Sequence, residues 1–242
     1  MLKLTHFRLC PLSRSIRLAL SECDMVFELE EERAWEWGAG FLALNPSGEL
    51  PVLEIEGEAV LCGAYSIVEY LAEGEDTLGL VGGALERRRL RLFPGSREDR
   101  AEVRRLVDWF HRKFHGEVSR ELLAEKVQPQ VSRLMSPKPV AGHTPTPAIL
   151  RAIRANMRHH LSYIDYLADQ RRWLAGEEPS FADLAAAAHL SAADYLGEVP
   201  WSEHANAKAW YSRVKSRPSF RPLLSDKLPG IAPPPHYADL DF

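Results

Sequence analysis

Residues 45–53 read Asn45-Pro46-Ser47-Gly48-Glu49-Leu50-Pro51-Val52-Leu53, and this stretch decides the fold. Its first four residues favour a turn, because proline and glycine both interrupt regular structure. The apolar residues that follow predict a strand at 50–55, and a break at Glu56-Gly57 separates it from a second strand at 58–61. The segment is therefore predicted to end a helix and to begin a β-hairpin.

Helix and strand patterns alternate on both sides of this hairpin. Apolar residues at helical spacing predict helices at 13–23, 38–44 and 64–72. Short apolar runs predict strands at 2–7 and 26–29. The resulting order, β-α-β-α-β-β-α, is that of an α/β sandwich of thioredoxin type with one mixed sheet.

The remainder of the chain is predicted to be helical. Amphipathic patterns cover 98–126 and 148–173, and prolines predict a loop at 136–147 between them. Ser180 and Asp183 have the spacing of a capping box, and the alanine-rich helix that follows carries little charge, which predicts a buried position. A further helix at 203–217 ends at a proline. We therefore predict an α/β thioredoxin-like domain at 1–80, a linker at 81–96, an all-α helical bundle at 97–224 and an extended, proline-rich tail at 225–242.

The composition argues against several classes of protein. A net charge of −4 over 242 residues does not suit a general nucleic-acid-binding protein. Three cysteines cannot all pair, so a disulfide scaffold is not expected and a reducing cytosol is the simple interpretation. No apolar run approaches the length of about 20 residues that a membrane span requires, so no direct membrane insertion is expected.

Charge is divided unevenly along the chain. Residues 1–85 carry 5 basic and 15 acidic residues, a net charge of −10, whereas the other 157 residues carry 25 and 19, a net charge of +6. An arginine cluster follows the change of sign, and it suits either a solvated helix face or a patch for an acidic partner. Its members are Arg87, Arg88, Arg89, Arg91, Arg97, Arg100, Arg104 and Arg105.

Four motifs, at 10–17, 45–53, 180–183 and 210–220, resemble those of the glutathione transferase superfamily and follow its order. This resemblance implies the glutathione transferase fold, a cis peptide bond before Pro51, and a homodimer. It also places Cys10 at the family's catalytic position, the N-terminus of the first helix, where a thiolate is stabilised. The Leu50 backbone, held by Pro51, is then expected to pair with the cysteinyl amide of glutathione.

The third anchor of the family is altered in this chain. The family usually has Glu-Ser before the third helix, where Gly63-Ala64 stands here. Losing two polar contacts to a charged ligand costs roughly 1.5–3 kcal/mol each, which weakens binding by about 10²–10⁴-fold. We therefore expect a degenerate glutathione pocket, a vestigial Cys10, no cofactor and no enzymatic activity. The alternative is a glutathione-dependent thiol transferase or reductase that uses Cys10.

Two segments are candidates for protein interaction. Trp35 and Trp37 lie where the family closes its glutathione pocket, and they either pack inward or anchor an interface. The tail suits an extended peptide that docks in a groove of this chain or of a partner, and its deletion is expected to leave the fold intact. No metal site is expected, because His111 and His115 have no convincing third ligand. The tail candidates are His236, Tyr237, Asp239, Leu240, Asp241 and Phe242.

The altered anchor and the unusual tail together resemble a non-enzymatic, cell-division branch of the family in alphaproteobacteria. That resemblance implies a cytoplasmic homodimer at the division site, which binds, bundles and curves filaments of the tubulin-like protein FtsZ and helps drive constriction. It also leaves the tail open to a divisome partner. A third hypothesis, a stress or scaffold protein with another partner, stays open.

Overall fold

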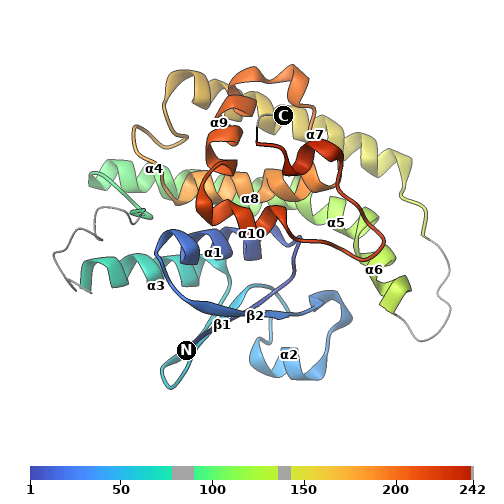
Figure 1. Ribbon diagram of the computed structural model, residues 1–242, viewed down its shortest axis with the longest axis horizontal. Coiled ribbons are helices and arrows are strands. Elements are labelled where there is room, and N and C mark those ends of the chain that lie inside the picture. Colours follow the sequence, from blue (N-terminus) through green and yellow to red (C-terminus); the bar gives the residue numbers. More distant parts are fainter. Residues whose placement is uncertain (78–89, 136–142, 241–242) are drawn as a thin grey trace.

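The computed structural model describes residues 1–77, 90–135 and 143–240 (Figure 1). An α/β layer forms its N-terminal part and a helical layer packs against it. The predicted order of elements in the first part is confirmed, with boundaries that differ by a few residues. The elements are β1 (Leu2–His6), α1 (Pro11–Glu22), β2 (Phe27–Glu31), α2 (Ala39–Leu44), β3 (Val52–Ile55), β4 (Ala59–Cys62) and α3 (Ala64–Thr77).

The four strands form one mixed sheet in the order β2-β1-β3-β4. β1 pairs with β2 in parallel, so a helical crossover, α1, must join them. β1 also pairs with β3, and β3 with β4, in antiparallel fashion, as the predicted hairpin requires. This arrangement sets the end of β1, the start of β3 and the start of α3 close to one another.

The second part consists of helices. The predicted single helix at 98–126 is a continuous helical stretch, but its middle, Trp109–Ser119, has π-helical geometry that no residue pattern indicated. The predicted helices at 148–173 and 203–217 are confirmed as α7 and α9. The elements are α4 (Arg97–Asp108), α5 (Arg120–Lys126), α6 (Gln128–Met135), α7 (Pro147–Gln170), α8 (Phe181–Tyr195), α9 (Ala205–Lys215) and α10 (Arg221–Leu224).

Helix α8 lies at the centre of the molecule, as its low charge predicted. Every one of its residues is buried. The Asp183 carboxylate accepts hydrogen bonds from the Ser180 backbone N–H (3.0 Å) and from the Leu174 N–H (2.9 Å), so the predicted cap also fixes the preceding loop. α8 packs directly against α1 of the α/β part, and its alanines allow the two backbones to approach closely.

Two apolar clusters hold the fold together. The larger cluster joins the sheet and α1 to the centre of the helical part, with Leu4 and Ile16 on one side and Leu184 and Trp210 on the other. A smaller cluster gathers residues from the two parts and from the C-terminal segment: Phe7, Leu9, Phe41, Leu50, Val52, Leu123, Val127, Val131, Tyr195, Leu228 and Tyr237.

Two of the described members of the arginine cluster pair with acids of this chain. Arg104 pairs with Glu69 of α3 (2.8 Å) and Arg105 pairs with Glu102 (2.7 Å). Arg87, Arg88 and Arg89 lie outside the described residues, as does the first part of the expected linker at 81–96. Among the helices that the structure describes, none is long and apolar enough to span a membrane.

Candidate functional site

A cleft of about 720 Å³ opens between the α/β part and the helical part. It gathers four of the predicted pocket residues, Cys10, Leu50, Gly63 and Ala64, around one space. The π-helical segment forms the opposite wall with His111 and His115. The other lining residues are Phe7, Leu12, Ala34, Trp35, Trp37, Ser47, Gly48, Glu49, Cys62, Tyr65, Ser66, Arg120, Leu123 and Gln128.

Cys10 occupies the N-cap position of α1, as the resemblance implied. Its backbone N–H donates to the Phe7 carbonyl (2.9 Å), which fixes the turn between β1 and the helix. Burial raises the pKa of the Cys10 thiol, although contacts with the Ser13 side chain and with the Ser13 and Leu12 amides act in the opposite direction. A raised pKa keeps the sulfur protonated at neutral pH, which is unfavourable for a nucleophile.

The backbone half of the family's glutathione pocket is present. The Leu50–Pro51 peptide bond is cis, as the resemblance implied. The Pro51 carbonyl accepts a hydrogen bond from the Gly63 N–H (2.9 Å), which ties the start of β3 to the start of α3.

The side-chain half of that pocket is missing at Gly63 and Ala64. Gly63 has a positive φ of 85°, a backbone conformation that a residue with a side chain adopts only at a cost in free energy. A Cβ at this position would meet no atom within 4 Å. Ala64 is 4% exposed and offers only a methyl group. The nearby Ser66 hydroxyl donates to the Gly63 carbonyl (3.0 Å). Neither position supplies a hydrogen-bonding side chain to a charged ligand in the cleft.

The two tryptophans have different environments. Trp35 packs inward: its ring meets Phe7 edge-on at 4.7 Å between ring centroids, and its indole N–H donates to Ser132 (3.0 Å). Trp37 is 62% exposed at the rim of the cleft. Its ring lies over Gly48, where a Cβ would approach it to 2.6 Å. Of the two candidates, Trp37 is therefore the one available to a partner.

A buried row of polar side chains behind the cleft was not predicted as a unit. His111 Nε2 lies 3.2 Å from the Ser15 hydroxyl, and His111 Nδ1 lies 3.2 Å from His189. The Ser119 hydroxyl completes the row at 2.7 Å from His189. Burial lowers the pKa of His111 to about 3 and lowers that of His189 well below its usual value. Within the described residues, no group of three potential ligands is placed to hold a metal ion.

The C-terminal segment, drawn in red in Figure 1, runs across the helical part, and its Asp239 carbonyl contacts Lys215 of α9. The segment was expected to be extended throughout, but a 3₁₀ turn begins at Pro235 (Pro235–Ala238). Proline is tolerated in the first turn of a helix, where its missing N–H is not needed. This turn directs the Tyr237 ring inward.

The position of Tyr237 argues against the expectation that deletion of the tail leaves the fold intact. Its side chain is fully buried in the smaller apolar cluster, next to Tyr195. Its hydroxyl accepts a hydrogen bond from Arg14 (3.0 Å) and donates one to the Leu223 carbonyl (3.0 Å). Of the two docking possibilities, the groove of its own chain is the one that Tyr237 occupies.

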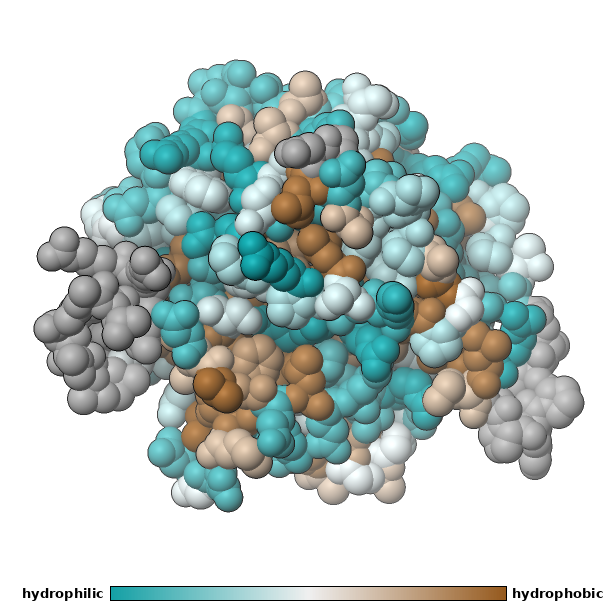
Figure 2. All heavy atoms as spheres, in the orientation of Figure 1, coloured by the Kyte–Doolittle hydropathy of each residue, from teal (hydrophilic) through white to brown (hydrophobic). Residues whose placement is uncertain are grey.

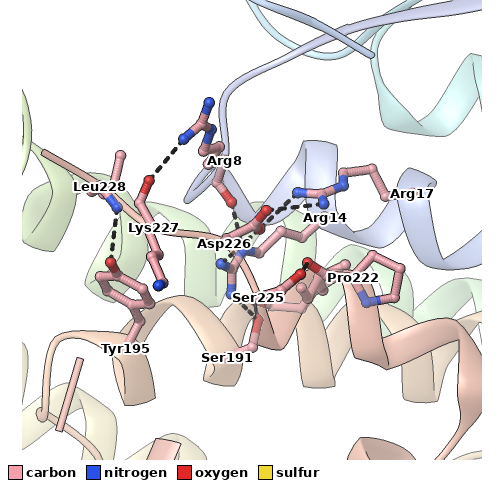
Figure 3. Close-up of polar contacts among 12 residues, drawn as sticks. Arg8, Arg14, Arg17, Ser191, Tyr195, Pro222, Ser225, Asp226, Lys227 and Leu228 are labelled. Carbon is pink, nitrogen blue, oxygen red and sulfur yellow. Dashed lines mark hydrogen bonds and ion pairs between the residues drawn. The ribbon is translucent and has the colours of Figure 1, made fainter. Parts of the chain in front are cut away.

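Arg14 is the centre of a polar network that includes Tyr237, and Figure 3 shows its contacts with Arg8, Ser191 and Asp226. The side chain is fully buried, and it donates to the Arg8 carbonyl (2.6 Å), Ser191 (2.8 Å), Tyr237 (3.0 Å) and Asp226 (3.2 Å). The guanidinium therefore connects α1, α8, the segment after α10 and the tail. The arginine belongs to the 10–17 motif, but the sequence alone gave no sign of its distant partners.

Further charged side chains bind the C-terminal segment to the rest of the chain. Arg17 donates to both carboxylate oxygens of Asp226, at 2.8 and 3.1 Å. The buried Lys215 donates to the carbonyl of His236 (3.2 Å), and the His236 ring lies 3.0 Å from the buried Asp194 carboxylate. Beyond this turn, Asp239 and Leu240 are exposed, whereas Asp241 and Phe242 lie outside the described residues.

Two sequence families match this chain. Residues 9–73 match the family described as glutathione S-transferase, N-terminal domain, and residues 121–218 match glutathione S-transferase, C-terminal domain. The fold, the cis bond before Pro51 and the position of Cys10 agree with these matches. The chain therefore belongs to the glutathione transferase family.

Within that family, the chain is similar over its whole length to a protein named for its localisation with FtsZ. It is 44% identical over 242 residues to FtsZ-localized protein A of Caulobacter vibrioides, with 99% of this chain and 97% of that protein covered. It is also similar to the solved structure of FzlA from C. crescentus, at 43% identity and a TM-score of 0.86, covering 100% of this chain and 99% of that one.

A second solved structure is comparably similar. A glutathione S-transferase from Sinorhizobium meliloti has 46% identity and a TM-score of 0.88, with 100% of both chains covered. The relatives thus include proteins named as glutathione transferases as well as one named for its localisation with FtsZ.

Proposed function

We propose that this chain is a non-enzymatic cell-division protein that binds FtsZ filaments, bundles and curves them, and helps drive constriction. The observation that carries the proposal is the full-length similarity to FtsZ-localized protein A. The cleft agrees with it, because Gly63 and Ala64 supply no polar side chain for glutathione and burial raises the pKa of Cys10.

The proposed assembly is a homodimer in the cytoplasm, at the division site. A dimer presents two equal surfaces related by a two-fold axis, and such a pair can cross-link neighbouring filaments. Trp37 at the rim of the cleft is our candidate contact with FtsZ, because it is the exposed member of the tryptophan pair. A divisome partner is proposed to engage the tail beyond the buried Tyr237, where Leu240 is 39% exposed.

Electron microscopy of FtsZ assembled with GTP tests the bundling and curvature. We expect straight single filaments without the protein, and bundled or curved filaments with it. Trp37→Ala, which removes the exposed ring of our candidate contact, should weaken bundling. Tyr166→Ala, which removes another exposed ring on α7, is the matched control and should not. Filaments unchanged by the wild-type protein would argue against the proposal.

The second candidate function is a glutathione-dependent thiol transferase or reductase. It is favoured by the thiol at the start of α1 and by the cis Leu50–Pro51 bond. This function requires turnover of dehydroascorbate or of a mixed disulfide with glutathione, and loss of that turnover in Cys10→Ala. No turnover by the wild-type protein would exclude it.

A further inference from the structure

The outer edge of β2 is an open side of the sheet. β2 is the first strand in the order β2-β1-β3-β4, and within the described part of the chain no strand or bridge pairs with its outer side. Phe27 is partly buried, and the other four residues of the strand are exposed. An open edge presents backbone N–H and C=O groups with which another extended chain can pair.

Apolar side chains are exposed along this edge. Val26, directly before the strand, is 91% exposed, and Leu29 within it is 45% exposed. Figure 2 shows apolar surface toward the lower left of the molecule, over the region where Figure 1 draws β1 and β2. Apolar surface beside an open strand edge is typical of a place where a partner binds.

The same edge is acidic. Glu30 pairs with Lys3 (2.9 Å) and Glu31 pairs with Arg8 (2.8 Å), but Glu28 has no ion-pair partner among the described residues. Two copies of the protein paired edge to edge would bring these carboxylates together, which is unfavourable. A second copy is therefore a poor occupant, and a basic segment is a favourable one.

The register of β2 against β1 assigns its side chains to two faces. Glu28 and Glu30 share a face with Lys3 and Thr5, whereas Leu29 is on the opposite face with Leu4. An added strand whose residues alternate between basic and apolar would thus present its cations on the Glu28 face and its apolar side chains on the Leu29 face.

We propose that the β2 edge binds an extended segment of a partner protein, with alternating basic and apolar residues, as a fifth strand of the sheet. Backbone pairing along Phe27–Glu31 supplies the attachment, and Glu28 selects the charge of the segment. The surface is separate from the glutathione-like cleft, whose lining includes no residue of β2, so the proposal does not depend on FtsZ binding.

Binding of a fluorescent heptapeptide of alternating Lys and Val to the full-length protein tests this proposal. We expect binding in low-salt buffer, together with slower amide hydrogen exchange confined to residues 27–31. A Glu-Val peptide and a Lys-Val peptide with a central proline are expected to bind at least about tenfold more weakly.

Matched protein variants identify the surface. Glu28→Lys is expected to weaken binding by about tenfold, since it replaces attraction with repulsion at an exposed site. Glu58→Lys, which changes an exposed acid at the turn between β3 and β4, is expected to leave binding within about twofold.

Three results would overturn the proposal. The first is equal binding of the Lys-Val and Glu-Val peptides, and the second is exchange protection outside β2. The third is no peptide binding by the wild-type protein; aggregation of Glu28→Lys would then show that the acids serve only to keep open edges apart.

Discussion

Arg14 shows how this fold accommodates a fully buried charge. Its donors reach a backbone carbonyl, two hydroxyl groups and the Asp226 carboxylate, so its hydrogen-bonding capacity is well used. Removing one partner of such a charge is strongly destabilising, because the remaining group stays buried without compensation. The tail residue Tyr237 is therefore a structural part of the protein.

Replacing Tyr237 by Phe measures how much the hydrogen bonds of its hydroxyl group contribute to stability. We expect Tyr237→Phe to lower the free energy of unfolding by about 1–3 kcal/mol, because a donor of the buried Arg14 loses its hydroxyl partner. Urea unfolding followed by circular dichroism gives the value. Tyr166→Phe, at a tyrosine that is 62% exposed, is the control and should change little; equal effects of the two variants would refute the structural role.

Cys10 is expected to react slowly with alkylating reagents. Burial raises the pKa of its thiol, so the reactive thiolate is scarce at pH 7. Peptide mapping after iodoacetamide treatment should show slower labelling of Cys10 in the native protein than of free cysteine, and faster labelling after unfolding. Native labelling faster than that of free cysteine would show an activated thiol and would support the transferase alternative.

At the scale of elements, the features that could be predicted from the sequence are those that neighbouring residues encode. The turn before Pro51, the periodicity of α7 and the low charge of α8 are properties of neighbouring residues, and all are confirmed. The hydrogen bond between Arg14 and Tyr237 joins residues 223 positions apart, and no local pattern encodes it. The π-helical geometry of Trp109–Ser119 was missed for a different reason, since the segment lies inside one amphipathic pattern that predicts only a helix.

The same distinction holds for the candidate site, where motifs predicted some residues and distant contacts fix the others. The motifs at Cys10, at Leu50-Pro51 and at Gly63-Ala64 led to one cleft, because each stands at a fixed position of a known fold. The inward packing of Trp35 depends on Phe7 and Ser132, which only the folded chain brings together.

Truncation of the tail is predicted to have two distinct outcomes. Removing residues 235–242 deletes the buried Tyr237 and should cost about 3–5 kcal/mol of stability, the usual range for loss of a large buried aromatic side chain. Removing only 240–242 keeps Tyr237 and the Asp239 carbonyl that Lys215 contacts, so the stability should stay close to that of the full chain. Thermal unfolding of both variants decides the matter; equal stabilities would contradict the anchoring role of Tyr237.

At the scale of the whole molecule, the buried His111 and the half-buried His115 connect stability to pH. Burial lowers the pKa of His111 to about 3 and that of His115 to about 4, below the usual value near 6.5. The unfolded chain therefore binds more protons than the folded chain between these values, so stability is full above pH 6.5 and falls as the pH decreases. At pH 5 a fully buried histidine such as His111 lowers the free energy of unfolding by about 2 kcal/mol relative to neutral pH.

Unfolding in urea at pH 7, 6 and 5 tests this dependence. The decline toward pH 5 should be shallower in His111→Asn than in the wild-type protein, whatever the variant's stability at pH 7. His159→Asn, at an exposed position on α7, should keep the wild-type slope. A wild-type stability that does not change between pH 7 and 5 would contradict the burial of these rings.

The central claim, that this member of the glutathione transferase family binds FtsZ filaments without catalysis, is tested most directly by co-sedimentation. Purified wild-type protein and Cys10→Ser are each pelleted with FtsZ assembled with GTP, beside FtsZ kept in GDP. We predict that both proteins pellet with the GTP-assembled filaments to the same extent, and that little of either pellets with GDP. Absence of both proteins from the filament pellet would contradict the claim.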